Sequence, residues 1–396
     1  MQNIKYFTLI NKYIEIWISL ALTIFLLGYF FFPTSSKHNT FFYIAVCAPL
    51  VFLAPKYYKQ LRLLTWLTAT ALLFSFYLYL NSLWSIHFSS SQSFKYLRYL
   101  LTLYCLFAAV FLIQKQSNYS EFLFKGFLFF GFFHSLFGIF NHFNNVTHPL
   151  ATRYNDPIDS AMLVGFLLLT CFWFISENKD WKKHFFYIIV SIPFVMIILL
   201  SKSRGPQLAM LLSIPLVPFF QSQSIKKLIL PAILLTFLIS CGLYITNTYT
   251  DIFSRGLTFP YRIEIWIASL KESFDYFWFG QGASHKPMIS IPSSNEKFNH
   301  SHNILLVTFR MGGILGVFLF SINLILCFFA ALKRDKSIEN LWAIWLFFGI
   351  TCLMSNGKYP LTRPSASWLA YWIPIAFICA SSSNFLRIKF NRETDH

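Results

Sequence analysis

The sequence has little charge for its length. Only 12% of its 396 residues are Asp, Glu, Lys or Arg, whereas 56% are hydrophobic and 49 are Phe. A soluble protein of this size carries about twice that charged fraction. The apolar residues form blocks of about 17 to 25 residues with almost no charge, the length that crosses a hydrocarbon core of about 30 Å. This composition excludes an ordinary soluble protein and predicts an all-α, polytopic membrane protein.

Cysteine pairs and acidic residues are also scarce. The seven cysteines stand singly in apolar blocks, without a Cys-x-x-Cys pair or a Cys/His cluster, so neither a disulfide framework nor a zinc site is indicated. Lys and Arg outnumber Asp and Glu by 32 to 15, but they form no continuous patch, and we expect no nucleic acid partner. Basic residues beside membrane spans usually report topology.

Twelve membrane spans are predicted, and residues 1–396 are interpreted as one integral membrane domain. The first apolar block lacks a cleavage site and is interpreted as a retained span. Short loops rich in Lys alternate with less basic ones, which places those loops and both termini in the cytoplasm. The expected spans are 13–32, 40–55, 63–82, 97–114, 121–142, 158–176, 184–200, 206–221, 228–247, 303–331, 339–356 and 366–386.

The opposite face carries arginines close to the ends of the spans. Arginine held at bilayer depth usually faces a cavity or a bound anion, although its side chain also reaches out to lipid headgroups. The sequence leaves both interpretations open for each of them. The residues are Arg98, Arg153, Arg204, Arg255, Arg262 and Arg363. Outer-face carboxylates are few, and the close pairs, Asp156 with Asp159 and Glu272 with Asp275, do not indicate a metal or another cofactor.

The largest loop, residues 247–302, lies between the ninth and tenth spans. Its stretch from Tyr261 to Asp275 predicts an amphipathic helix, with Ile263 and Trp266 on the apolar side. Such a helix typically lies along the membrane interface. The stretch 277–282 is interpreted as an aromatic anchor with a glycine turn, and 290–299 as a polar link.

A histidine segment follows this loop. His300-Ser301-His302-Asn303 leads directly into the tenth apolar block, so His302 is expected where water meets the membrane. Further in, Gly313 and Gly316 are small enough for another helix to approach closely. His300 is interpreted as an interfacial hydrogen-bonding residue.

Three outer-face motifs occur in a distinctive order. They are Ser203-Arg204-Gly205 between two spans; Arg262 and Trp266, spaced as Arg-x-x-x-Trp; and His302-Asn303, followed after nine residues by Gly313-x-x-Gly316. Together they resemble the bacterial O-antigen ligase family, whose wider relatives include O-antigen polymerases and protein O-oligosaccharyltransferases. The sequence departs from the family pattern at Val317, where Thr is common, and in 276–282, which lacks a proline.

The resemblance implies a glycosyltransferase of the GT-C-like type in the bacterial inner membrane, with its active site facing the periplasm. It would move a glycan from undecaprenyl diphosphate to a hydroxyl of lipid A–core during lipopolysaccharide biosynthesis, without a metal. An O-antigen polymerase, a protein O-oligosaccharyltransferase and a non-enzymatic lipid-linked glycan transporter remain alternatives. Transport is disfavoured because transporters bind near the bilayer midplane, whereas the polar residues here gather at one face.

The residues of the three motifs suit this chemistry. A guanidinium binds diphosphate oxygens through paired hydrogen bonds, and an imidazole can position a sugar hydroxyl or take its proton. Asn303 is expected to orient that imidazole. The expected partners are the lipid-linked donor, the lipid A–core acceptor and membrane lipids, and the oligomeric state stays open. The predicted catalytic residues are His302, Arg262 and Arg204, and the predicted substrate-binding residues are Arg153, Arg98, Asn303, Lys202 and Arg255.

Overall fold

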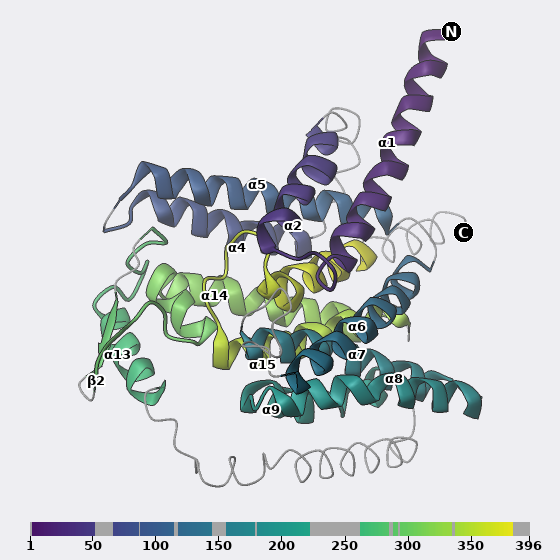
Figure 1. Ribbon diagram of the computed structural model, residues 1–396. Coiled ribbons are helices and arrows are strands. Elements are labelled where there is room, and N and C mark those ends of the chain that lie inside the picture. Colours follow the sequence, from purple (N-terminus) through teal and green to yellow (C-terminus); the bar gives the residue numbers. More distant parts are fainter. Residues whose placement is uncertain are drawn as a thin grey trace.

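The protein is a bundle of apolar helices with a short helix and a small sheet at one end (Figure 1). The computed structural model describes residues 2–51, 66–86, 88–114, 118–144, 156–178, 180–221, 262–284, 288–291, 294–334 and 337–382. The all-α, polytopic fold predicted from composition is confirmed. Arg153 and Arg255, together with the expected span 228–247, lie outside the described residues.

Seven helices of the described residues are long and apolar enough to cross a membrane. Two shorter apolar helices, Tyr13–Leu27 and Trp368–Ser382, coincide with the first and last expected spans. The count of twelve spans stays a prediction. The helices are α1 (Gln2–Leu27), α2 (Ser35–Phe42), η1 (Tyr43–Cys47), α4 (Trp66–Leu83), α5 (Ser90–Ile113), α6 (Tyr119–Phe143), α7 (Pro157–Glu177), α8 (Trp181–Leu200), α9 (Arg204–Ser213), α10 (Leu216–Gln221), α13 (Arg262–Phe274), α14 (Ile304–Leu332), η2 (Ile338–Asn340), α15 (Leu341–Asn356) and η3 (Trp368–Trp372).

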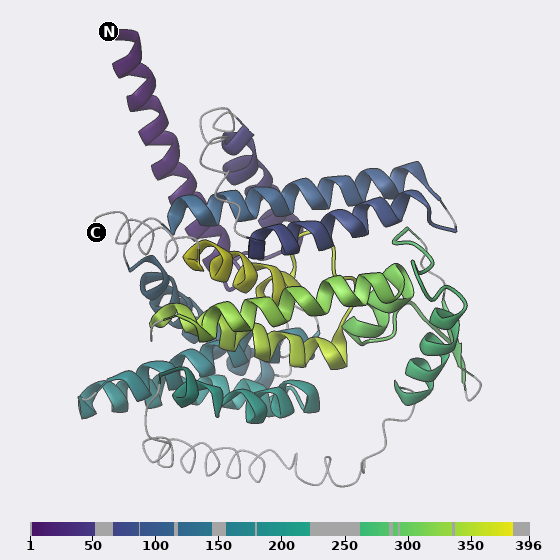
Figure 2. The same ribbon diagram turned by 180° about the vertical axis from the view of Figure 1, so that it is seen from behind.

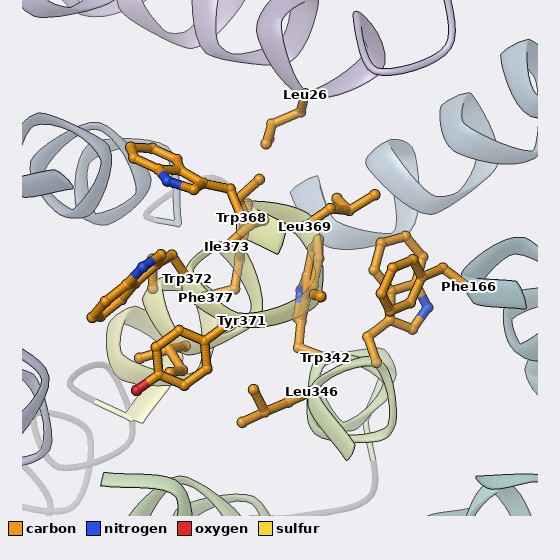
Figure 3. Packing of buried hydrophobic residues seen from close by; sticks show 14 of the residues in the cluster. Leu26, Phe166, Trp342, Leu346, Trp368, Leu369, Tyr371, Trp372, Ile373 and Phe377 are labelled. Atoms are coloured by element: carbon orange, nitrogen blue, oxygen red, sulfur yellow. The ribbon is translucent and has the colours of Figure 1, made fainter. Parts of the chain in front are cut away.

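The centre of the bundle is aromatic. Figure 3 shows Trp342 of α15 facing the helix that carries Trp368, Trp372 and Phe377. The Trp342 and Phe377 rings stack with their centroids 4.1 Å apart. Both buried indoles of α15 find oxygen partners: Trp342 donates to Ser120 and Trp345 to Thr170, each at 3.2 Å. A buried indole N–H needs such a partner, and here neither donor is left unsatisfied.

The loop helix predicted for 261–275 is confirmed as α13. It lies beside a two-stranded antiparallel sheet, β1 (Ile289–Ile291) and β2 (Ser294–Phe298), in which Ile289 faces Phe298. The stretch 290–299, interpreted as a polar link, thus includes β2 and part of β1, which the sequence did not predict. Ile289 and Ile291 point to one side of their strand and pack on Ile265 of α13, and this alternation stabilises the strand. Both views place α13 and the sheet at the end of the bundle away from the start of α1 (Figures 1 and 2).

Helix α14 is broken at Gly313, whose backbone has φ 61° and ψ −164°. Beside the break runs a segment of turn and irregular backbone, residues 277–282. Ile314 N donates to Phe277 O at 2.8 Å, and Gln281 N donates to Arg310 O at 2.9 Å. A Cβ on Gly313 would collide with the Trp278 carbonyl. The expectation that Gly313 admits a neighbouring helix is wrong: the missing Cβ admits the turn backbone at Trp278 and Phe279. The positive φ of Gly313 is one that glycine takes without strain.

Candidate active site

Helix α13 is fastened to the beginning of α14 at two points. The Trp266 indole N–H donates to Ser301 O at 2.9 Å. Nearer its end, Glu272 receives both Nε (2.9 Å) and Nη2 (3.2 Å) of Arg310, which is 7% exposed. Such a two-point guanidinium–carboxylate pair fixes direction as well as distance. Arg262 is one helical turn from Trp266, so the indole anchor holds the Arg262 end of α13 beside the histidine segment.

His302 has a left-handed backbone, with φ 53°. For a residue with a Cβ this conformation costs roughly 1–2 kcal/mol. The backbone N–H of His302 donates to Nδ1 of His300 at 3.3 Å, and the two imidazole rings meet edge to face with centroids 4.1 Å apart. Strained residues of this kind persist where the surrounding structure holds them, often at functional sites. The two histidines therefore form one unit at the start of α14.

Asn303 caps α14. Its side-chain oxygen accepts hydrogen bonds from Leu305 N at 2.9 Å and Leu306 N at 3.2 Å, which satisfies backbone donors that the helix leaves open. The side chain of Asn356, the last residue of α15, acts on the pKa of the His302 imidazole from another element. Orientation of the imidazole by Asn303 and contact between Asn303 and substrate both stay predictions.

Asp156 joins these elements from the start of α7. Its Oδ1 caps that helix by accepting from Ile158 N at 2.9 Å, while its Oδ2 accepts from Asn356 Nδ2 at 3.3 Å. Lys358 lies 3.9 Å from the same oxygen. We call this group the outer polar cluster. Its members are Asp156, Arg262, His300, His302, Asn356 and Lys358.

Sequence reasoning missed Asn356 and Lys358 and gave Asp156 no role. Asn356-Gly357-Lys358 did carry a signal, because it directly ends an apolar block on the face that the sequence predicts to be the outer one. Gly357 explains why this segment lies so close to the histidines. A Cβ at Gly357 would collide with the backbone nitrogen of Ile304, so the glycine lets the end of α15 touch the start of α14.

The surroundings keep both histidines uncharged at neutral pH. Burial lowers the pKa of His302, and the positive charges of Arg262 and Lys358 lower it further; the hydrogen bond with Asn356 and the charge of Asp156 oppose them. Burial and the neighbouring His302 lower the pKa of His300 to about 4. Burial also lowers the pKa of Arg262, which Asp156 partly offsets, but guanidinium groups remain protonated in proteins. The cluster therefore combines a neutral imidazole with fixed positive charge.

The Ser-Arg-Gly turn lies next to this cluster. Arg204 is the first residue of α9, and Gly205 approaches Ser355 so closely that a Cβ there would collide with the serine hydroxyl. Ser355 directly precedes Asn356, so the structure brings the turn to the same end of α15. Lys202 is exposed in this turn and has a positive φ of 51°.

Arg98 is placed differently. It is exposed on α5, and its guanidinium carbon lies 5.6 Å from the centre of the Tyr99 ring. The charged groups that act on His302 in the described part of the chain come from other elements, α13 and the ends of α7 and α15. Substrate binding by Arg98 stays a prediction. Among the described residues, no three His, Cys, Asp or Glu side chains are grouped so that they could hold a metal ion.

Comparisons with known proteins agree with the order of the motifs. Residues 188–321 match the protein family described as O-antigen ligase, a range that includes Arg204, Arg262 and His302. A stretch of 127 residues is 35% identical to a protein named O-antigen ligase from Pseudomonas aeruginosa. That stretch is 32% of this chain and 31% of the relative, so the match spans about a third of either protein.

Proposed function

We propose, from the match of residues 188–321 to the O-antigen ligase family, that this protein transfers a glycan from undecaprenyl diphosphate to a hydroxyl of lipid A–core. The observation that carries the proposal is the meeting of all three sequence motifs at one end of the bundle. There, a neutral imidazole lies beside the charge of Arg262, and Arg204 begins the adjacent helix. The reaction needs these two properties, a proton acceptor and positive charge.

The donor end of the reaction uses the positive charge. As the bond between the sugar carbon and the diphosphate breaks, its electron pair stays on the diphosphate oxygen, which gains negative charge. Preorganised cations in a site shielded from water stabilise such charge more strongly than they would in water. Arg262 and Arg204 would hold the diphosphate oxygens, and Lys358, which sequence reasoning did not identify, adds a third positive charge at this end. Arg153, Arg98, Lys202 and Arg255 are further candidate contacts.

The acceptor end uses His302. The sugar hydroxyl attacks the anomeric carbon, and its proton passes to the neutral imidazole, which later releases it to water. Proton removal by a positioned base typically contributes about 10²–10⁴-fold to a rate. No step of this scheme is routed through a metal.

The arrangement of the helices supports a site that faces the periplasm. The outer polar cluster lies at the α13 end of the bundle, and the start of α1 lies away from it (Figure 1). With both termini in the cytoplasm of an inner-membrane protein, the cluster would open to the periplasm. The lipid-linked donor would then enter sideways from the bilayer, and lipopolysaccharide would be the product.

The test is a gel of lipopolysaccharide and of lipid-linked glycan from a deletion strain that receives one variant at a time. We expect His302→Ala, Arg262→Ala and Arg204→Ala to insert normally, to leave lipid A–core without O-chain, and to accumulate long glycan on the polyprenyl carrier. Lys271→Ala is the matched control for Arg262→Ala, because Lys271 is exposed near the other end of α13. His184→Ala, at the start of α8, is the control for His302→Ala.

The same gel separates the alternatives. A single repeat attached to core in the deletion strain would identify a polymerase, because ligation would still occur. Unchanged lipopolysaccharide would contradict both enzymes and direct the search to an unglycosylated protein or to transport. Full activity of any one of the three site variants would remove that residue from the proposed site.

A further inference from the structure

Helix α13 turns large apolar side chains away from the protein. Ile263, Ile267, Leu270 and Phe274 follow one another at intervals of four, three and four residues, the spacing that keeps side chains on one face of a helix. All four are exposed, by 39% to 58%. We call these four residues the outer stripe of α13. Contiguous exposed apolar surface marks a contact with a membrane or with another molecule.

The side of α13 that faces the protein is already occupied. Ile265 is buried against β1. The Trp266 indole N–H donates to Ser301 O at 2.9 Å. The Glu272 carboxylate is paired with the Arg310 guanidinium. These contacts fix α13 with its outer stripe pointing away from the bundle, so the stripe needs an apolar partner other than the core.

The outer stripe continues into the exposed side of α14. Trp278, four residues after Phe274, is exposed. The carbonyl oxygens of Phe277 and Trp278 accept hydrogen bonds from the backbone of α14, Phe277 O from Ile314 N at 2.8 Å. From that point a row of exposed apolar side chains follows one face of α14, which is a candidate membrane span, and such a row on a span faces lipid. The row is Ile314, Phe318, Ile325, Phe329 and Leu332.

Aromatic side chains gather where the two apolar surfaces meet. Trp278 and Phe279 are exposed, and so is Trp84, directly after α4, whose ring meets the Phe279 ring edge to face with centroids 6.5 Å apart. Aromatic rings of this kind are enriched where membrane meets water. Beside the outer stripe, Lys271 and Asp275 are exposed on the polar side of α13. A helix with these two sides lies in the plane of the membrane surface, and α13 runs at an angle to α14 (Figures 1 and 2).

We propose that the outer stripe of α13 docks on the lipid bilayer, with its side chains among the upper acyl chains and with Lys271 and Asp275 in water. Continuity with the exposed side of α14 favours the bilayer over a second copy of the chain. Arg262 directly precedes Ile263, the first residue of the stripe, so docking holds the guanidinium at the level of the lipid phosphates.

The consequence for the donor rests on the proposed function. The lipid chain of the donor stays in the bilayer, and its diphosphate therefore lies at the same level as the phosphates of the surrounding lipids. A docked α13 brings Arg262 to that level. The guanidinium then meets the diphosphate without lifting the carrier out of the membrane.

The first experiment measures the depth of α13 without activity. The full-length protein carries one environment-sensitive fluorescent amino acid at position 267, 270 or 271 and is reconstituted in vesicles of phosphatidylethanolamine and phosphatidylglycerol. Fluorescence at 267 and 270 should be quenched strongly by nitroxide-labelled lipid and weakly by iodide in the water. Position 271, on the polar side of the same helix, is the matched control and should show the reverse.

Two results would overturn the docking. One is equal quenching by iodide at all three positions, which would place the outer stripe in water. The other is protection of positions 267 and 270 from both quenchers, because a second copy of the chain or another segment of this chain would then cover the stripe.

The second experiment measures glycan transfer in the same vesicles. Ile267→Glu and Leu270→Glu should raise KM for the lipid-linked donor roughly tenfold, the factor by which losing one buried apolar side chain changes an equilibrium. The value of kcat should change little, because the outer polar cluster is intact. Lys271→Glu puts the same new side chain on the polar side and should keep the wild-type KM. Unfolding midpoints in detergent should agree among the three variants, because all three positions are exposed.

The two proposals fail differently. A wild-type KM in both Ile267→Glu and Leu270→Glu would contradict the placement of Arg262 by the bilayer. A wild-type protein that transfers no glycan would instead contradict the proposed function, and the quenching would still decide whether α13 docks on the bilayer.

Discussion

The two ends of α15 show two ways of assembling helices. Toward its start, Trp342 and Trp345 are fully buried among Phe124, Phe166 and Phe377. At its last residue, Asn356 donates a hydrogen bond to the carboxylate of Asp156, which stands at the start of α7. The aromatic end gains stability from contact area, which many different side chains can supply. The polar end contributes little to stability. Its hydrogen bonds form only when each side chain presents the right atom in the right direction.

This difference follows from the environment. In a lipid bilayer the helix exterior is as apolar as its interior, so packing of large rings, rather than exclusion of water, holds the aromatic end together. The polar end lies where the helices stop and backbone groups need partners. Asp156 and Asn303 each cap a helix there, and the same caps bring functional side chains together. Substitutions at the aromatic end should therefore reduce stability, and substitutions at the polar end should reduce activity.

The largest effect on stability is expected from Trp345→Ala in the aromatic end. Removing a fully buried indole typically costs about 3–5 kcal/mol, and Thr170 would also lose its donor. Thermal unfolding of the purified protein in detergent should show a strongly lowered midpoint. Trp278→Ala is the matched control because Trp278 is 69% exposed, and its midpoint should change little. Equal midpoints for the two variants would contradict the core described for α15.

Gly313→Ala should have an intermediate effect at the outer end. The new Cβ meets the Trp278 carbonyl at a positive φ, and such strain costs of order 1–3 kcal/mol. We expect residues 277–282 to separate from α14, which amide hydrogen exchange at Ile314 and Gln281 would detect as faster exchange. In the control Gly316→Ala, an added Cβ meets its neighbours no closer than 3.4 Å, and exchange should remain slow. Slow exchange in both variants would mean that the segment is held elsewhere.

The smallest effect is expected from pH, and only at the outer end. Because the pKa of His300 in the folded protein is about 4 and its usual value is 6.5, the unfolded chain binds a proton there before the folded chain does. Stability should therefore fall as pH decreases below about 6.5 and level off below about 4. His300→Gln should make the unfolding midpoint less dependent on pH across that window, whereas His184→Gln should not. A steeper dependence in His300→Gln would contradict the burial of His300.

Activity should follow His302 in the same direction. The pKa of His302 is lowered, so its neutral form persists below pH 6.5, and the acid limb of the transfer rate should lie below that pH. Rates of the purified protein measured from about pH 4 to 8 would show this limb. An acid limb above 6.5 would mean that the ring is less buried, or more strongly paired with a carboxylate, than in this structure.

Much of the fold could be predicted because a lipid bilayer restricts which segments of a chain can cross it. Runs without charge had to be spans, so the limits expected for α7, α8 and α15 lie within a few residues of those observed. The apolar spacing in the loop predicted α13. Two features escaped prediction. The break at Gly313 is a contact with residues about 35 positions earlier, and the β1–β2 pair depends on Ile265 of a different element, so neither leaves a local periodicity.

The candidate site was predictable in the same uneven way. Arg204, Arg262 and His302 were found because the chemistry of diphosphate transfer and the spacing of family motifs select these residue types. Asp156, Asn356 and Lys358 were not found. Each of these residue types is common at the end of a membrane helix. From the sequence alone, such a residue is interpreted as a helix cap or as a topology signal.

The sequence by itself determined that the chain is a helical membrane protein, which segments are apolar, and which arginines and histidine suit glycan transfer. The tertiary structure alone decided which helix ends meet. Two glycines without room for a Cβ, Gly205 and Gly357, let the ends of α9, α14 and α15 touch. The carboxylate of Asp156 at the start of α7 accepts a hydrogen bond from Asn356 at the end of α15. These contacts join residues some 50 to 200 positions apart in the sequence. A local pattern of residues does not show which distant residue each one will contact.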